Sequence, residues 1–280
     1  MKIKILGSGG GERYPAAFCS CEHCEEARRV GGKSLRSLSQ TLINDDLIID
    51  FPLDTDMHCV SFGINLGKIE NALITHTHSD HFLPIIANGR GDLNAHNFKY
   101  EKFYFYGPDK MEEVYDKLVA VYGENPICRK NLVFVPFSFL ETKKVGNYKV
   151  TAIRAKHFMH YNSLNYIIEE GEKKLLYLID TGYPLDETFE YFKQNNYVFD
   201  CVIMDATMGY SPAETYIYHM GFDENKRLKE DMIKRGFATQ STRFIADHIT
   251  HNKAETHEKT EKIFENTGIE VAYDGMEIEI

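Results

Sequence analysis

Three histidines and an aspartate lie within six residues in the stretch "LITHTHSDHF", where an H-x-H-x-D-H motif directly follows an apolar run. The members of this motif are His76, His78, Asp80 and His81. Residues two apart in an extended segment project to the same side, so His76 and His78 are placed to share one metal ion. We expect the chain then to turn into a helix start, from which Asp80 and His81 reach a second ion. Two metal ions about 3.5–4 Å apart activate a water molecule and clamp both oxygens of a displacement.

Further residues of ligand type follow other apolar runs. They are His157 after "TAIRA", with His160 three positions later as the alternative, Asp180 after "LLYLI", and His248 after "RFIAD", with His251 three positions later. A carboxylate such as that of Asp180 has two oxygens and is able to bridge two cations. Their recurrence at the ends of apolar runs predicts that these side chains converge on one edge of a sheet.

A second group of metal-binding type lies in "FCSCEHC", where Cys19, Cys21 and Cys24 have the spacing C-x-C-x-x-C. A closed zinc site needs four ligands, so these three cysteines require one more. The other three cysteines are scattered singly along the chain, which indicates reduced thiols and no disulfide framework.

Composition limits the possible function classes. The chain has 280 residues, 43% hydrophobic and 26% charged, which is typical of a soluble globular protein. A formal charge of −10 argues against non-specific binding to nucleic acid, which depends on a basic surface. We find no signal-peptide pattern and no apolar stretch of membrane-spanning length, so we expect a cytoplasmic protein with no membrane partner.

The elements that must position these residues are read as one α/β domain over residues 1–280, because no linker-like composition shift or repeat is visible. The loop 7–11, rich in glycine, is interpreted as a tight turn because the Gly-Lys-Ser/Thr ending of a phosphate loop is absent. Strands are expected at 2–6, 47–51, 71–75, 131–137, 148–155, 164–170, 174–180, 199–205 and 242–247, and helices at 109–123, 223–236 and 252–268.

In order along the chain, H-x-H-x-D-H, a later histidine after a strand, the aspartate of "IDTG" and a final histidine resemble the signature of the metallo-β-lactamase fold superfamily. The resemblance extends from Lys2 to Ile280. It implies a four-layer αββα sandwich with two metal ions at one edge of its two sheets. The ligands it implies are His76, His78 and His157 for one ion, Asp80, His81 and His248 for the other, and Asp180 as the bridge.

Within that superfamily, "GSGGGERYPAAFCSCEHCEEARR", "DHITHN" and the closing "DGMEI" are similar to PhnP-type phosphodiesterases, which hydrolyse phosphoribosyl cyclic phosphate. That resemblance implies a structural zinc held by Cys19, Cys21, Cys24 and His251. His23 is a rival fourth ligand, but it adjoins Cys24 and would crowd the site. The resemblance also implies a homodimer, and it places His219 where a histidine assists the leaving group.

We therefore expect a dinuclear phosphodiesterase acting on a small, cyclic (phospho)ribosyl diester, with manganese or zinc at the active site. Its catalytic residues would be His219, as proton donor to the leaving oxygen, and Asp80. Alternatives are a nuclease, a thioester or lactone hydrolase of the same fold, a flavin-linked diiron redox protein, and a non-catalytic relative from cofactor biosynthesis. The last type, PqqB, lacks the full H-x-H-x-D-H motif.

Other polar residues have less definite roles. His58, His96 and His257 lie in helical or polar contexts and are expected at the surface. Asp247 precedes His248, and two readings stay open for it: its carboxylate orients His248, or it points to solvent.

Overall fold

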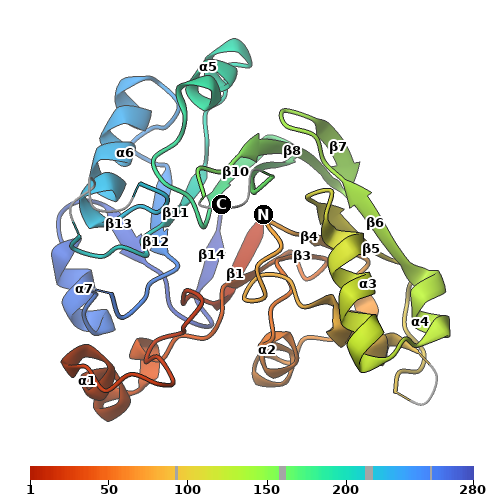
Figure 1. Ribbon diagram of the computed structural model, residues 1–280. Coiled ribbons are helices and arrows are strands. Elements are labelled where there is room, and N and C mark those ends of the chain that lie inside the picture. The colour runs from red at the N-terminus through yellow and green to blue at the C-terminus, as the bar shows by residue number, and fades with distance from the viewer. Residues whose placement is uncertain (92–93, 158–161, 212–216, 253) are drawn as a thin grey trace.

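Two β-sheets face each other and carry helices on their outer sides (Figure 1). The computed structural model describes residues 1–280 except 92–93, 158–161, 212–216 and 253. Over the described residues, each sheet has seven strands. The four layers form the αββα sandwich that the sequence predicts.

The first sheet holds both ends of the chain. Its strand order is β14-β1-β2-β3-β4-β5-β6. The strands are β1 Lys2–Gly7, β2 Gln40–Ile43, β3 Leu47–Ile49, β4 Asn71–Leu73, β5 Phe103–Gly107, β6 Leu132–Pro136 and β14 Glu277–Glu279. Strands β3 to β6 are parallel, so their carboxyl ends lie at one edge of the sheet.

The second sheet follows the order β13-β12-β11-β10-β9-β8-β7. Its strands are β7 Thr142–Val145, β8 Tyr148–Arg154, β9 Leu164–Glu170, β10 Lys173–Leu178, β11 Cys201–Asp205, β12 Arg243–Asp247 and β13 Ile269–Val271. Strands β10 to β13 are parallel. Parallel strands buried on both faces are continuously apolar, which is why "CVIMD" and "KLLYLI" could be recognised from sequence.

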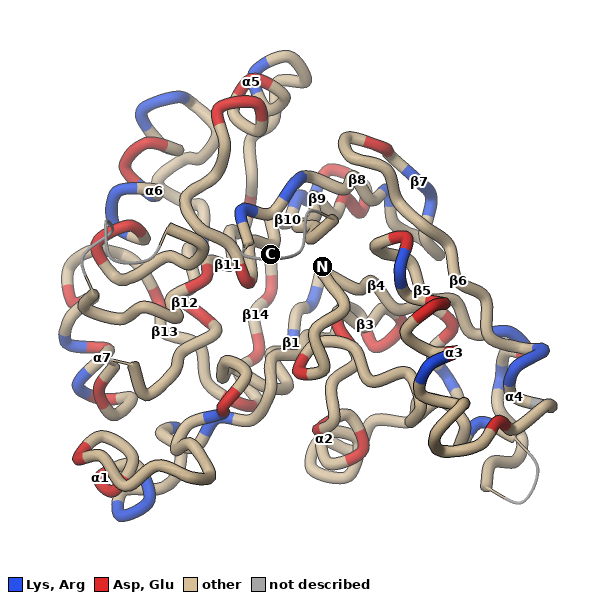
Figure 2. The backbone as a smooth tube through the Cα atoms, viewed as in Figure 1, with Lys and Arg blue, Asp and Glu red and all other residues tan. Residues whose placement is uncertain are grey.

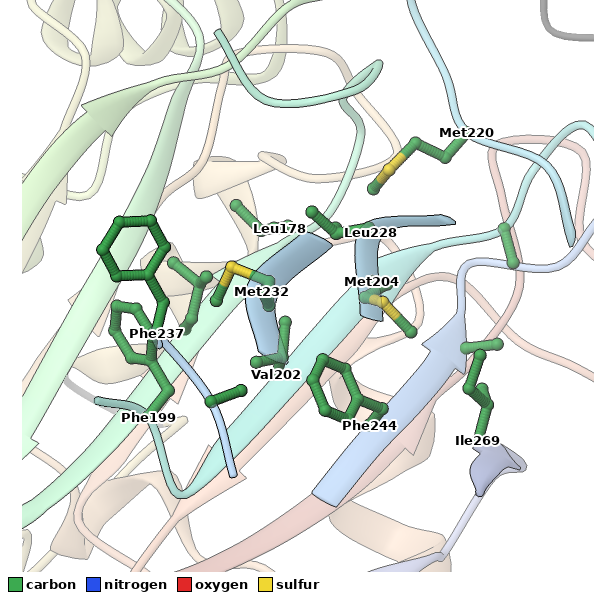
Figure 3. Packing of buried hydrophobic residues seen from close by; sticks show 14 of the residues in the cluster. Leu178, Phe199, Val202, Met204, Met220, Leu228, Met232, Phe237, Phe244 and Ile269 are labelled. Carbon is green, nitrogen blue, oxygen red and sulfur yellow. The ribbon is translucent and has the colours of Figure 1, made fainter. Parts of the chain in front are cut away.

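The outer layers consist of helices. They are α1 Glu22–Val30, α2 Thr55–Phe62, α3 Met111–Tyr122, α4 Pro126–Asn131, α5 Asp186–Gln194, α6 Phe222–Lys234 and α7 His257–Ile263, with short 3-10 segments at Gly32–Ser34, Leu66–Lys68 and Pro84–Arg90. In α6, Leu228 and Met232 are spaced by one turn and fully buried. Figure 3 shows both side chains close to Val202 and Met204 of β11.

Three apolar layers hold the sandwich together. One lies between the two sheets and includes Ile5, Ile49, Tyr166 and Ile203. The other two lie between each sheet and its outer helices. Because the buried strands cannot shift without opening these layers, the loops at the strand ends are held in fixed positions.

Two of the three histidines expected at the surface are buried. The side chains of His58 and His257 are 3% and 2% exposed, while His96 is exposed as predicted. His58 lies between Ser37 and Gln40, at 2.7 and 2.6 Å, and His257 Nδ1 lies 3.2 Å from Arg36. These partners are distant in sequence, so the polar helical context of each histidine did not reveal its burial.

Candidate metal centre

The H-x-H-x-D-H motif occupies the loop that follows β4 at the carboxyl edge of the first sheet. His76 and His78 come first, and Asp80 and His81 form a turn. The helix expected to start there is absent from the motif, since the next helical segment is the 3-10 turn that begins at Pro84. The turn is nevertheless closed, because the backbone N–H of His81 donates to the carbonyl oxygen of His78 at 3.0 Å.

One group of ligand atoms combines both sheets. His76 Nε2 lies 2.9 Å from His78 Nδ1 and 3.1 Å from Asp180 Oδ2. His157 Nε2, from the loop after β8, lies 3.3 Å from the same His78 nitrogen and 3.8 Å from Asp180 Oδ2. These four atoms lie within 4.8 Å of one another. His160, the alternative to His157, lies outside the described residues.

A second group shares Asp180 with the first. His81 Nε2 lies 3.1 Å from Asp180 Oδ2, 3.4 Å from Asp80 Oδ2 and 3.3 Å from His248 Nε2. The structure thus brings together all seven residues that the sequence nominates for a dinuclear site. Asp180 lies in both groups, the place expected of a bridging carboxylate.

The spacing of these atoms fits divalent metal ions. A metal bound to imidazole nitrogens at about 2.0–2.1 Å holds neighbouring ligand atoms roughly 2.9–3.4 Å apart, from octahedral to tetrahedral geometry. The measured separations of His76, His78 and His81 from their neighbours, 2.9–3.4 Å, lie in that range. Asp180 Oδ1 is buried and accepts no hydrogen bond among the described residues, although His219 Nδ1 lies 3.1 Å away. The residues present therefore fit a pair of cations.

Partners behind the ligands fix which nitrogen faces the centre. Asp50 Oδ2 lies 2.8 Å from His81 Nδ1, so Nδ1 carries the proton and Nε2 presents its lone pair. Thr207 Oγ1 accepts from His248 Nδ1 at 2.7 Å and donates to the His248 carbonyl oxygen at 3.2 Å. Asp50 and Thr207 were not identified from sequence, although Asp50 ends an apolar run just as Asp180 does.

Asp247 does not point to solvent. Its side chain is fully buried, and Oδ1 accepts the backbone N–H of His248 at 2.8 Å. The carboxylate therefore orients the His248 backbone, while Thr207 orients the ring. Burial raises the pKa of Asp247 to about 6.

Three residues of the site have left-handed backbone conformations. The φ angles are 64° at Asp50, 55° at Asp180 and 61° at His248. Each follows the end of a buried strand, and residues other than glycine rarely adopt φ above zero. This conformation turns the chain sharply at the sheet edge, and such strain is concentrated at functional sites.

Electrostatics at the centre favour a cation. Burial opposes a charge on His81, but Asp50 and Asp80 outweigh it and hold the pKa of His81 well above its usual value, so a metal ion binding at Nε2 would displace a proton from that nitrogen. Burial likewise opposes a charge on Asp180, but His248, His76 and His81 outweigh it and hold the pKa of Asp180 well below its usual value. Burial lowers the pKa of His76 to about 3 and that of His157 to about 4, so these two imidazoles are neutral, as metal ligands must be.

His219 lies beside the centre and is held by Asp205, the last residue of β11. His219 Nδ1 donates to Asp205 Oδ2 at 3.0 Å. Burial opposes a charge on His219, but the charge and hydrogen bond of Asp205, with Asp180, raise its pKa to about 9. Asp205 also accepts the backbone N–H groups of Thr181, Thr207 and Met220. No role was predicted for Asp205 itself, although it ends a strand as Asp180 nearly does.

The site opens into a cleft of about 350 Å³. Its lining residues are Gly11, Glu12, His78, Asp80, His157, Asp180, Thr207, His219, His248 and Thr250. The glycine-rich loop thus also brings its backbone close to residues of the site. A Cβ on Gly11 would lie 2.8 Å from Asp80 Oδ2, and one on Gly10 would lie 2.5 Å from Thr250 Cγ2 and 3.3 Å from the His248 ring. Only glycine allows the backbone this close to the ligands.

The fourth residue of the cysteine cluster is His251, which lies far from the cysteines in the sequence. His251 Nδ1 lies 3.4 Å from Cys19 Sγ and 3.6 Å from Cys21 Sγ, and Cys24 belongs to the same group. A tetrahedral zinc with bonds of about 2.3 Å to sulfur and 2.0–2.1 Å to nitrogen requires an S···N separation of roughly 3.5 Å, so the geometry fits. His23 is directed elsewhere, with its ring nitrogens 3.8 Å from Glu22 and Glu255.

The sequence matches the family model described as "Beta-lactamase superfamily domain" over residues 59–249. The chain belongs to this superfamily. The matched range contains all seven residues of the dinuclear cluster and ends before His251, so the cysteine cluster lies outside it. The family binds divalent metals, typically two per site.

Solved structures share the fold at low sequence identity. A diphosphatase from the PhnP family superposes with a TM-score of 0.74 at 19% identity, covering 100% of this chain and 97% of that one. Zn²⁺-bound PqqB from Methylobacterium extorquens gives 0.68 at 16% identity, with 100% of both chains covered. The short form of human tRNase Z gives 0.67 at 16%, covering 100% and 99%. A comparison with curated proteins finds no match.

Across the part of the chain that the structure describes, no helix has both the length and the apolar character needed to cross a bilayer.

Proposed function

We propose that the chain is a dinuclear metal-dependent phosphodiesterase that hydrolyses a small cyclic (phospho)ribosyl diester. One observation carries this proposal: three groups of metal-binding side chains share Asp180, and the cleft beside them is lined by His219, a member of the third group with a raised pKa. Hydrolysis of a phosphodiester requires bound cations that activate water and a proton donor for the leaving oxygen, and this site offers residues for both.

Different residues of the chain would have different roles in the reaction. One divalent ion would be held by His76, His78 and His157. The other would be held by Asp80, His81 and His248, and Asp180 would bind both ions. When bound, such ions supply an activated water and neutralise charge on the phosphate oxygens. Asp80 lines the cleft, so its carboxylate serves both as a ligand and as a wall of the substrate site.

His219 is assigned as the proton donor to the leaving oxygen. Its Nδ1–H is directed at Asp205, which fixes the ring and leaves Nε2 as the nitrogen that transfers a proton. With a pKa of about 9, the ring carries that proton at neutral pH. A departing ribose alkoxide is a poor leaving group, so a positioned acid has its largest effect there.

The size and charge of the protein favour a small substrate. A cleft of about 350 Å³ is near the lower end of the range of ligand sites. Figure 2 shows Lys and Arg interspersed with Asp and Glu along the described chain, and the formal charge of −10 argues against a nucleic acid substrate. Among the structural neighbours, the PhnP-family diphosphatase supports phosphate-ester chemistry, and tRNase Z makes short RNA the substrate to test against it.

We assign the Cys19, Cys21, Cys24 and His251 cluster to a structural zinc. Three thiolates and an imidazole select zinc over manganese. Burial opposes the thiolate of Cys21, but His251 and the neighbouring donors outweigh it and lower the Cys21 pKa to about 6. Burial raises the pKa of Cys24 to about 12, so this thiol would lose its proton only on binding the metal.

The test is turnover of the manganese-loaded and the zinc-loaded protein on a cyclic ribose phosphate, a nucleoside cyclic phosphate, a linear nitrophenyl diester, a short RNA and a thioester. Highest kcat/KM on the cyclic ribose phosphate, lost on chelation and restored by the metal, is the expected result. Cleavage of RNA alone or of the thioester alone would overturn the substrate assignment, and Asp180→Ala is the inactive control.

A further inference from the structure

Glu12 connects the cysteine cluster with the catalytic cleft. It follows the glycine loop and lines the cleft together with Gly11, Asp80 and His248. Its carboxylate oxygen Oε1 lies 3.4 Å from His251 Nε2. That nitrogen is on the opposite side of the imidazole from Nδ1, which faces the sulfur atoms. One ring is therefore held between three cysteines and a carboxylate.

A carboxylate next to the outer nitrogen of a ligand histidine has a known physical effect. It favours the tautomer with the proton on Nε2, so that Nδ1 presents its lone pair to the metal. Glu12 is itself fixed, because Asn252 Nδ2 donates to the same Oε1 at 2.8 Å. Asn252 thus holds the same carboxylate oxygen that lies 3.4 Å from His251 Nε2.

The backbone beside Glu12 is in contact with the ligands of the dinuclear site. Arg13 N–H donates to the Gly10 carbonyl oxygen at 2.8 Å, which closes the turn. The guanidinium of Arg13 pairs with Asp54 through two hydrogen bonds of 2.9 and 2.7 Å, so the far side of the turn is anchored as well. An added Cβ on Gly11 would lie 2.8 Å from Asp80 Oδ2, and one on Gly10 would lie 3.3 Å from the His248 ring, so this turn runs directly beside both residues.

We propose that Glu12 is a positioning residue that orients His251 toward the cysteine cluster and transmits the state of that cluster to the dinuclear site. This inference rests on the proposed function, because it takes both clusters as metal sites. It assigns a role to a residue outside the matched family range.

The first experiment measures the cysteine site through its ligands. Cobalt bound by thiolates gives a sulfur-to-metal charge-transfer band that a site of histidines and carboxylates does not give, so a Co²⁺ titration of the full chain reports the cysteine cluster alone. We expect Glu12→Ala to weaken Co²⁺ binding about 10–100-fold. Glu12→Gln keeps a hydrogen-bond acceptor without the charge and should fall between Glu12→Ala and the wild type.

The matched control is Glu22→Gln. Glu22 is next to Cys21 in sequence, but its carboxylate faces His23 at 3.8 Å. It removes one negative charge close to the cysteines without touching His251, so Co²⁺ binding should equal that of the wild type. If Glu22→Gln and Glu12→Gln weaken Co²⁺ binding equally, the effect comes from the loss of a negative charge anywhere near the cysteines, and the positioning role is overturned. Co²⁺ binding by Glu12→Ala that equals that of the wild type would overturn it as well.

The second experiment tests the coupling with a double-mutant cycle of Glu12→Ala and Cys21→Ser, read out as Mn²⁺ affinity of the dinuclear site by the electron paramagnetic resonance of free Mn²⁺. If Glu12 transmits the state of the cluster, each single variant weakens Mn²⁺ binding and the double variant is no weaker than Cys21→Ser. Additive effects would overturn the coupling. Failure of the proposed function is distinguishable, since a wild-type protein without turnover on any diester would still give both binding results.

Discussion

His219 Nδ1 lies 3.0 Å from Asp205 Oδ2, and this contact joins the loop before α6 to the end of β11 beside the dinuclear site. Asp205 is completely buried and accepts three backbone N–H groups besides the imidazole, so its position is fixed by the sheet edge. The pairing sets both the orientation and the charge of His219.

Replacing Asp205 by asparagine should move the alkaline limb of the activity profile to lower pH. Asp205 raises the pKa of His219, and the protonated ring is the acid, so activity falls as pH rises through that pKa. Without the carboxylate charge, the His219 pKa drops toward its ordinary value of about 6.5, and kcat at pH 8 should fall about tenfold or more. The measurement is kcat against pH for both proteins with the same metal. An unshifted limb would show that Asp205 does not set the charge of His219.

His219→Ala should lower turnover more for a substrate whose leaving group must be protonated than for one whose leaving group departs as a stable anion. For an alkoxide leaving group, the loss should be about 10²–10⁴-fold in kcat. Nitrophenolate leaves without protonation, so a nitrophenyl diester should lose much less. Parallel assays of an alkyl and a nitrophenyl diester decide the point. Equal losses for the two diesters would contradict the proton-donor role.

Sequence nominated the residues that the structure brings together at the candidate dinuclear site because their signal is local. His76, His78, Asp80 and His81 share one short loop, and the remaining ligands each follow an apolar run. Asp50 and Asp205 also end or follow buried strands, so the signal that pointed to Asp180 was present for them too. Their partners, however, lie 31 and 14 positions away along the chain, and only the sheet register brings them together.

The glycine loop shows the limit of a local reading. Its composition predicts a tight turn at residues 7–11, whereas the structure has the turn at residues 11–13 and ends β1 at Gly7. The neighbours that leave no room for a Cβ in this loop, such as Leu38 beside Gly7 and Asp80 beside Gly11, come from other segments of the chain. Likewise His58 and His257 lie in polar helical segments, and their burial depends on Gln40 and Arg36. The four-layer sandwich was accessible because the order of the ligand motifs resembles the metallo-β-lactamase superfamily, whereas the pattern of elements alone indicated only one α/β domain and not the packing at long sequence distance.

Cys21→Ser should remove a zinc ion and lower thermal stability. The serine hydroxyl is a poor zinc ligand, and the cluster ties α1 and its preceding loop to the segment that carries His251. A loss of about 2 kcal/mol would lower the Tm of a chain of this size by roughly 4–8 °C. Zinc content and Tm are measured side by side. The control is Cys59→Ser, a cysteine of α2 that belongs to none of the metal-type clusters among the described residues. Unchanged zinc content in Cys21→Ser would refute the structural site.

Gly11→Ala should weaken the dinuclear site without removing a ligand. The added Cβ would lie 2.8 Å from Asp80 Oδ2, closer than any ordinary contact, so either the loop or the carboxylate must move. Because Asp80 is expected to bind one of the two ions, we predict a metal affinity about 10–100-fold lower and a matching fall in kcat/KM at limiting metal. Gly89→Ala serves as control, since a Cβ there meets nothing within 4 Å. Activity of Gly11→Ala that recovers fully at high metal concentration would place the defect in metal binding, and wild-type metal affinity would refute the close packing of this loop on Asp80.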